Sequence, residues 1–246
     1  ELASGTVERF KSRLTAKGFT QQKHRDYELI FAPVVRFATV RFLVALAAKY
    51  DLELDQMDVG NAFVTSNLDT DDLYMEIPPW FEYLTSSPPP VSQDPRPGIG
   101  EPASAPMREL RRKLKIATSK AQIREGRFKG KALRLKKALY GLKQSSRCFN
   151  DKLSAYLATV DPAKPELGFT RSGTDYSIYY KRVPRAEPNE RTGDGSPFAD
   201  HDILIIASYV DDLILLCTSR PMLDAFKRRI AADFKMTDMG AMTLSL

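Results

Sequence analysis

The chain has 246 residues, enough for one large domain or two small ones, and 43% apolar with 28% charged residues is an ordinary globular composition. These values exclude wholesale disorder and a collagen-like repeat, and two cysteines, Cys148 and Cys217, make neither a disulfide framework nor a zinc cluster. The longest apolar stretch, residues 203–217, contains two aspartates and is too short to span a bilayer, so we expect a soluble intracellular domain with no membrane partner.

The net charge of +6 is unevenly distributed along the chain. Residues 107–137 hold thirteen Lys and Arg against Glu109 and Glu125, a local charge of +11, so the remainder carries −5. Clustered cations suit a polyanion, because they release counterions from nucleic acid. A solvated, partly helical segment without a ligand would explain the same charges, and both interpretations stay open.

The first part of the chain is predicted to form a hairpin, a helix and a strand. Loose alternation over residues 5–22 predicts the hairpin. Thr39 opens the helix, whose apolar side chains share one face. A period-two pattern over residues 52–58 predicts a strand that ends near Asp58, before a turn at Gly60–Asn61.

Two polar excursions interrupt the pattern of helices and strands. Nine of the sixteen prolines lie between Pro78 and Pro106, a density that prevents both helix and ladder formation. We therefore interpret residues 85–130 as an insertion, first Pro-rich and then basic, and residues 184–202 as a polar loop.

The second half of the chain alternates helices with strands. Apolar spacing predicts a helix over residues 145–157, and residues 175–180 resemble a strand. Two apolar runs flank Asp-Asp within residues 203–217, the pattern of a buried β-hairpin. A last helix starts after Ser219 or Pro221. This irregular order favours the α+β class over a doubly wound parallel sheet.

Three aspartates are the candidates for chemistry. Asp211 and Asp212 lie between buried strands, where adjacent carboxylates are costly unless a cation such as Mg²⁺ neutralises them. Asp58 ends another strand and precedes Gly60, which would let phosphates approach the backbone. Adjacent strand ends would bring three carboxylates together, enough for two Mg²⁺ ions. The alternatives are an exposed hairpin tip and a solvent-facing strand end.

The same residues resemble a known family. YVDD at Tyr209–Asp212 resembles the catalytic motif of reverse transcriptases, and DVGNAF at Asp58–Phe63 resembles their first-aspartate motif. More narrowly, six blocks in family order are similar to Ty1/copia-type retrotransposon polymerases. These blocks are residues 9–21, 31–48, 56–64, 73–81, 135–147 and 234–242.

The resemblance implies one right-hand polymerase domain over residues 1–246, which acts as an RNA-directed DNA polymerase within a Pol polyprotein. Its fingers would be about residues 1–53 and 85–147, and its palm about 54–84 and 148–246. The palm would be a split β-α-β antiparallel sheet with helices on one face.

The resemblance also implies the metal site. Asp58 and Asp211 would hold two Mg²⁺ ions, with Mn²⁺ as a substitute, while Asp212 assists and Val59 lies in the same site. Val59 and Gly60 would offer backbone N–H groups to the triphosphate.

Around this centre the resemblance implies a nucleotide pocket. Phe63 would lie under the deoxyribose and select dNTPs over rNTPs; a core Phe is the alternative. Lys11, Arg13 and Lys17 lie on the expected fingers hairpin, where Arg13 is the favoured contact to the triphosphate, and solubility is the alternative. Tyr140–Gly141 would lie beside the nucleotide, or else form a buried turn.

Further positions would contact template and primer. Lys143 would lie near the template, and Tyr209 in the YVDD motif near the primer. Met239–Gly240 would begin the primer-gripping hairpin, although a helix C-cap would explain Gly240 equally well. His24 and His201 are isolated, so we expect surface residues, and both cysteines are expected to be small buried hydrophobes.

The chain departs from the family in three places. Residues 85–130 lengthen a connection that is usually short, Ser145–Ser146–Arg147 replaces a common Ser-Pro-Arg, and the chain stops at Leu246, where a thumb is expected. The expected partners are an RNA template, a DNA primer, dNTPs and the RNase H and integrase parts of the polyprotein, in cytoplasmic retrotransposon particles. One alternative is an inactive remnant that still binds nucleic acid. Another is an interaction module whose Pro-rich loop recruits SH3- or WW-like domains.

Overall fold

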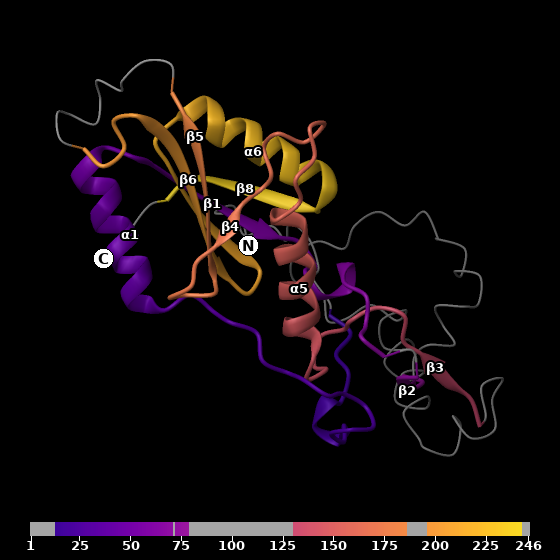
Figure 1. Cartoon of the computed structure of the whole chain (residues 1–246). Helices are drawn as coiled ribbons and strands as arrows, with labels where there is room; N and C mark the ends of the chain where they lie inside the picture. The colour runs from indigo at the N-terminus through magenta and orange to yellow at the C-terminus, as the bar shows by residue number, and fades with distance from the viewer. Residues whose placement is uncertain (1–12, 71, 79–129, 186–195, 243–246) are drawn as a thin grey trace, which may run out of the picture. The chain divides into compact units, whose positions relative to one another are not determined.

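The computed structural model describes residues 13–70, 72–78, 130–185 and 196–242 (Figure 1). The chain divides into two compact units, residues 1–70 with 136–246 and residues 71–135. Nearly all of the predicted 85–130 insertion lies outside the described residues. Within the described part, no helix is long and apolar enough to cross a membrane.

A six-stranded sheet forms the centre of the first unit, in the order β4-β5-β6-β7-β1-β8, with every neighbouring pair antiparallel. Its strands are β1 (Glu53–Val59), β4 (Thr170–Arg171), β5 (Ile178–Pro184), β6 (His201–Tyr209), β7 (Asp212–Cys217) and β8 (Met236–Ala241). The hairpin predicted around Asp-Asp is β6–β7, and the strand predicted to end near Asp58 is β1. The mixed class with an antiparallel sheet is therefore confirmed.

Helices cover both faces of this sheet: α1 (Phe37–Tyr50), α5 (Ser145–Leu157) and α6 (Arg220–Asp233) (Figure 1). Helices α5 and α6 pack on alternate residues of β6 and β7, such as Leu204 and Leu213. Helix α1 packs on the intervening ones, such as Ile203 and Ile214. The expectation of helices on one face holds for α5 and α6. Helix α1, from the range expected for the fingers, covers the other face, because both faces of these strands are apolar and each buried side chain contributes about 1.5–3 kcal/mol.

The helix boundaries depend on local and distant caps. Helix α5 has the predicted bounds, and α6 starts after Ser219, whose hydroxyl accepts a hydrogen bond from the Met222 N–H. Helix α1 begins two residues before Thr39. The Asp175 carboxylate accepts bonds from the Arg36 N–H at 3.3 Å and the Thr39 hydroxyl at 2.8 Å, so a distant acid caps this end.

The predicted hairpin at residues 5–22 does not form in its described half. Thr15 makes an isolated bridge to Tyr140, and Gly18–Thr20 is a 3₁₀ turn, η1. A second 3₁₀ turn, η2, covers Phe63–Thr65. In the second unit, β2 (Tyr74–Glu76) pairs antiparallel with β3 (Ala132–Arg134).

Candidate active site

Two of the predicted acids lie opposite each other on neighbouring strands. Asp58, near the end of β1, is the partner of Asp212 at the start of β7, and Tyr209 of β6 flanks Asp212 on its other side. Asp211 lies in the two-residue turn between β6 and β7. The Val59 N–H donates to the Asp211 carbonyl oxygen at 2.8 Å, which ties this turn to β1. The fold thus gathers all three acids at one end of the sheet.

The backbone of Val210, in this turn, has a strained conformation. Its φ of +58° lies in the left-handed region, which a β-branched residue rarely adopts. Such conformations persist only where the surroundings impose them, and they are concentrated at functional sites. Here the flanking pairs, Tyr209 with Asp212 and Ser208 with Leu213, impose the turn.

The acids repel one another electrostatically. Burial raises the pKa of the Asp212 carboxyl, and the charges of Asp211 and Asp58 raise it further, whereas a 3.3 Å hydrogen bond from the Gln56 amide lowers it. Within the described ranges, no side chain or N–H group donates a hydrogen bond to the carboxylates of Asp58 and Asp211, and no cationic side chain forms an ion pair with them. Negative charge therefore accumulates here without a cation from the protein itself.

The donor chemistry of this cluster fits a hard divalent cation, because it consists of half-buried carboxylates whose charges disfavour one another. In the part of the chain that the structure describes, no group of three or more His, Cys, Asp or Glu side chains is placed so that it could hold a metal ion. Asp58, Asp211 and Asp212 are candidate ligands by their chemistry and their backbone placement alone.

The backbone donors expected for the triphosphate are already engaged. The Val59 N–H donates to the backbone carbonyl oxygen of Asp211, as described, and the Gly60 N–H donates to the Lys235 carbonyl oxygen at 2.7 Å. A Cβ on Gly60 would also press on this oxygen. This differs from the expectation that both N–H groups face a ligand, and the sequence could not reveal these partners.

A second cluster joins three residues expected at the nucleotide. The rings of Phe63 and Tyr140 meet edge to face, with centroids 4.8 Å apart, and the Arg13 guanidinium lies 5.7 Å from the Tyr140 ring centroid. Lys11 lies outside the described residues. The structure therefore brings Arg13, Phe63 and Tyr140 together from three distant parts of the chain.

Two glycines allow the segments of this cluster to approach each other. Gly141 has φ +89°, and a Cβ there would collide with the Ala16 carbonyl oxygen. A Cβ on Gly18 would collide with the Gly141 carbonyl oxygen. The Ala16 N–H donates to the Tyr140 carbonyl oxygen at 2.8 Å, so backbone meets backbone without an intervening side chain.

The remaining predicted residues have different surroundings. The Lys143 ammonium donates to the Gln21 carbonyl oxygen at 3.1 Å and lies over the Tyr27 ring, so its charge is used within the fold. Tyr209 and Met239 are more than half exposed. Gly240, with φ +75°, lies in strand β8, so the helix C-cap alternative is wrong.

The histidine expectation is only half correct. His24 is exposed, but His201 is largely buried, and its Nε2 atom has no hydrogen-bond partner among the described residues. Both cysteines are buried free thiols, as predicted.

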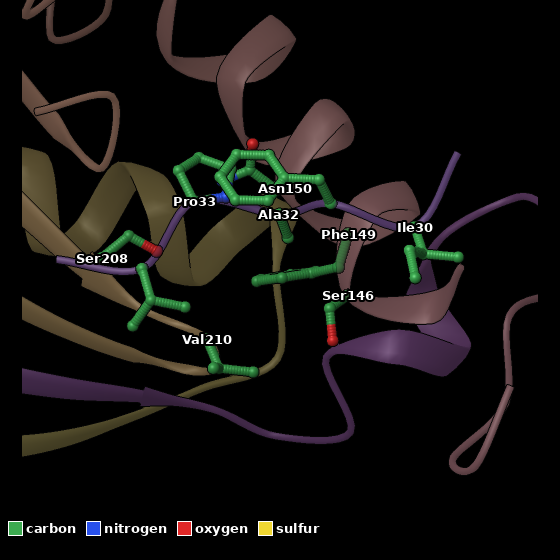
Figure 2. A pocket seen from close by; sticks show the side chains of 10 residues that line it. Ile30, Ala32, Pro33, Ser146, Phe149, Asn150, Ser208 and Val210 are labelled. Carbon is green, nitrogen blue, oxygen red and sulfur yellow. The ribbon is translucent and has the colours of Figure 1, made fainter. Parts of the chain in front are cut away.

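A pocket of about 380 Å³ next to the acidic turn was missed by the sequence analysis. Residues 30–34, the start of α5 and the β6–β7 turn line it, and Figure 2 shows Ser208 and Val210 at one end and Ile30 and Ser146 at the other. Its lining is mostly apolar, with hydroxyl and amide groups from Ser146, Ser208 and Asn150. No sequence signal marks these residues beyond their place within or beside the blocks of the resemblance.

Comparison with known proteins places this geometry in context. The family described as "Reverse transcriptase (RNA-dependent DNA polymerase)" matches residues 3–88 and 116–246. The unmatched internal residues, 89–115, fall within the Pro-rich and basic stretch. No solved structure was found to match the chain.

Curated relatives include three plant transposon polyproteins. The chain is 26% identical over 94% of its length to the Retrovirus-related Pol polyprotein from transposon TNT 1-94 of Nicotiana tabacum. It is 28% identical over 87% of its length to that from transposon RE2, and 26% over 96% to that from RE1, both of Arabidopsis thaliana. It spans only 13%, 10% and 12% of these relatives. From the family match over most of its length, the chain belongs to the reverse transcriptase (RNA-dependent DNA polymerase) family, as a domain of the copia type.

Proposed function

We propose that this chain is the fingers–palm part of an RNA-directed DNA polymerase, with Asp58, Asp211 and Asp212 as its catalytic acids. The observation that carries the proposal is the placement of Asp58 opposite Asp212 with Asp211 in the adjoining turn. Burial, and after it the charges of Asp211 and Asp58, raise the pKa of the Asp212 carboxyl, which supports a bound cation as the partner of this cluster.

The three carboxylates would hold two Mg²⁺ ions, or Mn²⁺ in their place. The bound ions would supply Lewis-acid activation of the primer 3′-OH and stabilise the departing pyrophosphate. The chain's own part is to fix the acids on β1 and β7 and to keep the Val210 turn beside them. Positioning and charge neutralisation would then supply most of the rate.

The aromatic cluster would bind the incoming dNTP. Arg13 would attract the triphosphate, and Tyr140 would hold both the Arg13 guanidinium and the Phe63 ring in place. A ring at Phe63 under the sugar would leave no room for a 2′-hydroxyl, so rNTPs would be excluded.

The proposed partners are an RNA template, a DNA primer and the remaining parts of a Pol polyprotein in intracellular particles. These extend beyond this chain, which spans about a tenth of the length of the curated relatives it matches.

The test is primer extension on poly(rA)–oligo(dT) with Mg²⁺ and dTTP. Wild type, Asp211→Asn and, as a matched control, Asp161→Asn would be compared; the Asp161 carboxylate accepts a local bond from the Ala163 N–H. We expect extension by wild type and Asp161→Asn, and a loss of about a thousandfold or more in Asp211→Asn.

A second readout distinguishes an active polymerase from an inactive remnant that still binds nucleic acid. Template binding would be followed by fluorescence anisotropy at several salt concentrations, because phosphate contacts give salt-sensitive binding. Binding without extension in wild type, unchanged by Asp211→Asn, would reject catalysis and favour a nucleic-acid-binding remnant.

A further inference from the structure

A network of charges with a buried centre, Asp55 and Lys227, joins helix α6 to strands β1 and β8. The Lys227 ammonium lies 2.6 Å from Asp55 Oδ2 and 2.7 Å from Asp238 Oδ2. The side chains of Asp55 and Lys227 are only 1% and 7% exposed, and Arg220 reaches Asp55 at 3.2 Å. Burial lowers the pKa of Lys227, but the bonds to Asp238 and Asp55 outweigh burial and raise it overall. Lys227 is therefore a charged bridge between two strands.

Asp238 uses its other oxygen to shape a bulge in β8. Met57 pairs with Asp238 and Gln56 with Gly240, so Met239 has no partner on β1. The Gly240 N–H donates to Asp238 Oδ1 at 2.9 Å, and Gly240 has φ +75°. One carboxylate thus closes the bulge and holds Lys227, while Met239 stays 57% exposed.

This bulge lies beside the acidic cluster. Thr237 of β8 pairs with Asp58, on the strand side opposite Asp212. Gln56 pairs with Gly240 at the bulge, and its side-chain amide donates a hydrogen bond to the Asp212 carboxylate. A shift of the bulge would therefore move the residues next to the acids.

Buried ion pairs contribute little net stability, since desolvation offsets their attraction, but they fix geometry. We infer that Lys227 is a positioning residue: held by Asp55, it holds Asp238 and so fixes the Met239 bulge as a contact for the primer strand. This inference rests on the proposed function, because it deepens the role of the same site.

The test compares wild type with Lys227→Met, Lys227→Arg and Asp238→Asn. The matched control is Arg229→Met, on the same helix, since Arg229 pairs with Glu166 and not with β8. Asp238→Asn keeps the side-chain volume at a half-exposed position, so it tests the contact even if Lys227→Met fails to fold. KM for primer–template and for dTTP, anisotropy with primer–template, and amide hydrogen exchange at Gly240 would be measured.

We expect Lys227→Met and Asp238→Asn to raise the primer–template KM about tenfold, with the KM for dTTP unchanged. Exchange at Gly240 should accelerate in both variants. Lys227→Arg should recover most of both effects, and Arg229→Met should show neither.

Equal changes in the two KM values, or unchanged Gly240 exchange, would overturn the inference. A wild type that extends no primer refutes the proposed function but leaves the positioning testable by exchange and anisotropy. In that case, faster exchange with weaker primer–template binding in both variants supports the inference, and no binding by wild type overturns it.

Discussion

Strand β1 carries two aspartates, Asp55 and Asp58, whose surroundings differ completely. Because successive side chains alternate, Asp55 faces α6, where Lys227 and Arg220 balance its charge. Asp58 faces the opposite side, opposite Asp212, and no cation in the described ranges reaches it. The protein itself neutralises Asp55, whereas the charge of Asp58 is left for a cation from outside the protein.

The comparison separates stability from function on a single strand. A compensated buried acid is needed by the native state, because its removal leaves a buried lysine with less countercharge. An uncompensated acid in a cluster of like charges opposes folding, so its removal relieves repulsion. Four predictions sharpen this contrast, from the largest expected effect to the smallest.

Neutralising each acid of β1 should have opposite effects on stability. Asp55→Asn should lower the free energy of unfolding by about 3–5 kcal/mol, because it breaks a buried ion pair. Asp58→Asn should leave the free energy unchanged or raise it. Urea denaturation at neutral pH measures both, and equal losses in the two variants would refute the contrast.

Mg²⁺ should stabilise the wild type through the acidic cluster. At a hundredfold excess over Kd, a ligand that binds only the folded state adds about 2.7 kcal/mol. Thermal unfolding with and without Mg²⁺ should show this rise in wild type and in the control Asp161→Asn, but not in Asp58→Asn. A rise that persists in Asp58→Asn would place the binding site elsewhere.

Relieving the backbone strain at Val210 should stabilise the acidic end. Asparagine tolerates the left-handed region, so Val210→Asn should raise the free energy of unfolding by about 1 kcal/mol. Val183→Asn, on strand β5, is the control and should not stabilise, since Val183 does not have a positive φ. A loss of stability in Val210→Asn would show that the side chain matters more than the strain.

The contribution of Asp238 to the free energy of unfolding should depend on pH only in acid. Burial raises the pKa of Asp238, but the bonds from the Lys227 ammonium and the Gly240 N–H, together with the charges of Lys227 and Arg220, outweigh burial and lower it below the ordinary 3.8. Its contribution to stability is then complete above pH 3.8 and is lost as pH falls through the lowered pKa. Asp238→Asn should be less stable than wild type at neutral pH, and urea titrations should show this gap closing in acid.

Local pattern was sufficient for the elements that carry the acids, β1 and the β6–β7 hairpin, and for helices α5 and α6. The apolar periodicity of each can be read within a short stretch of the chain. Residues 13–22 were mispredicted because their partner is the Tyr140 loop, far away in the chain. The hydrogen bonds of the Val59 and Gly60 N–H groups could not be predicted for the same reason, because their acceptors also lie far away in the chain.

The candidate site was predicted by residue type more than by contact. Three aspartates at strand ends could be expected to meet, whereas the Phe63–Tyr140 contact joins segments that no periodicity links. The Lys227 network did leave a signal that went unused. Lys227 lies between Leu223 and Ile230 on the inward face of α6, where a charge requires a partner.

The contact of Gly18 with Gly141 couples two distant sequence positions in any copy descended from a common element. A side chain at either one would push residues 16–18 away from residues 140–142 and so separate Arg13 from Tyr140. A descendant could then keep all three aspartates and still lose the proposed nucleotide contact of Arg13. Among decaying copies, these glycines would be a more sensitive record of a lost proposed function than the three aspartates.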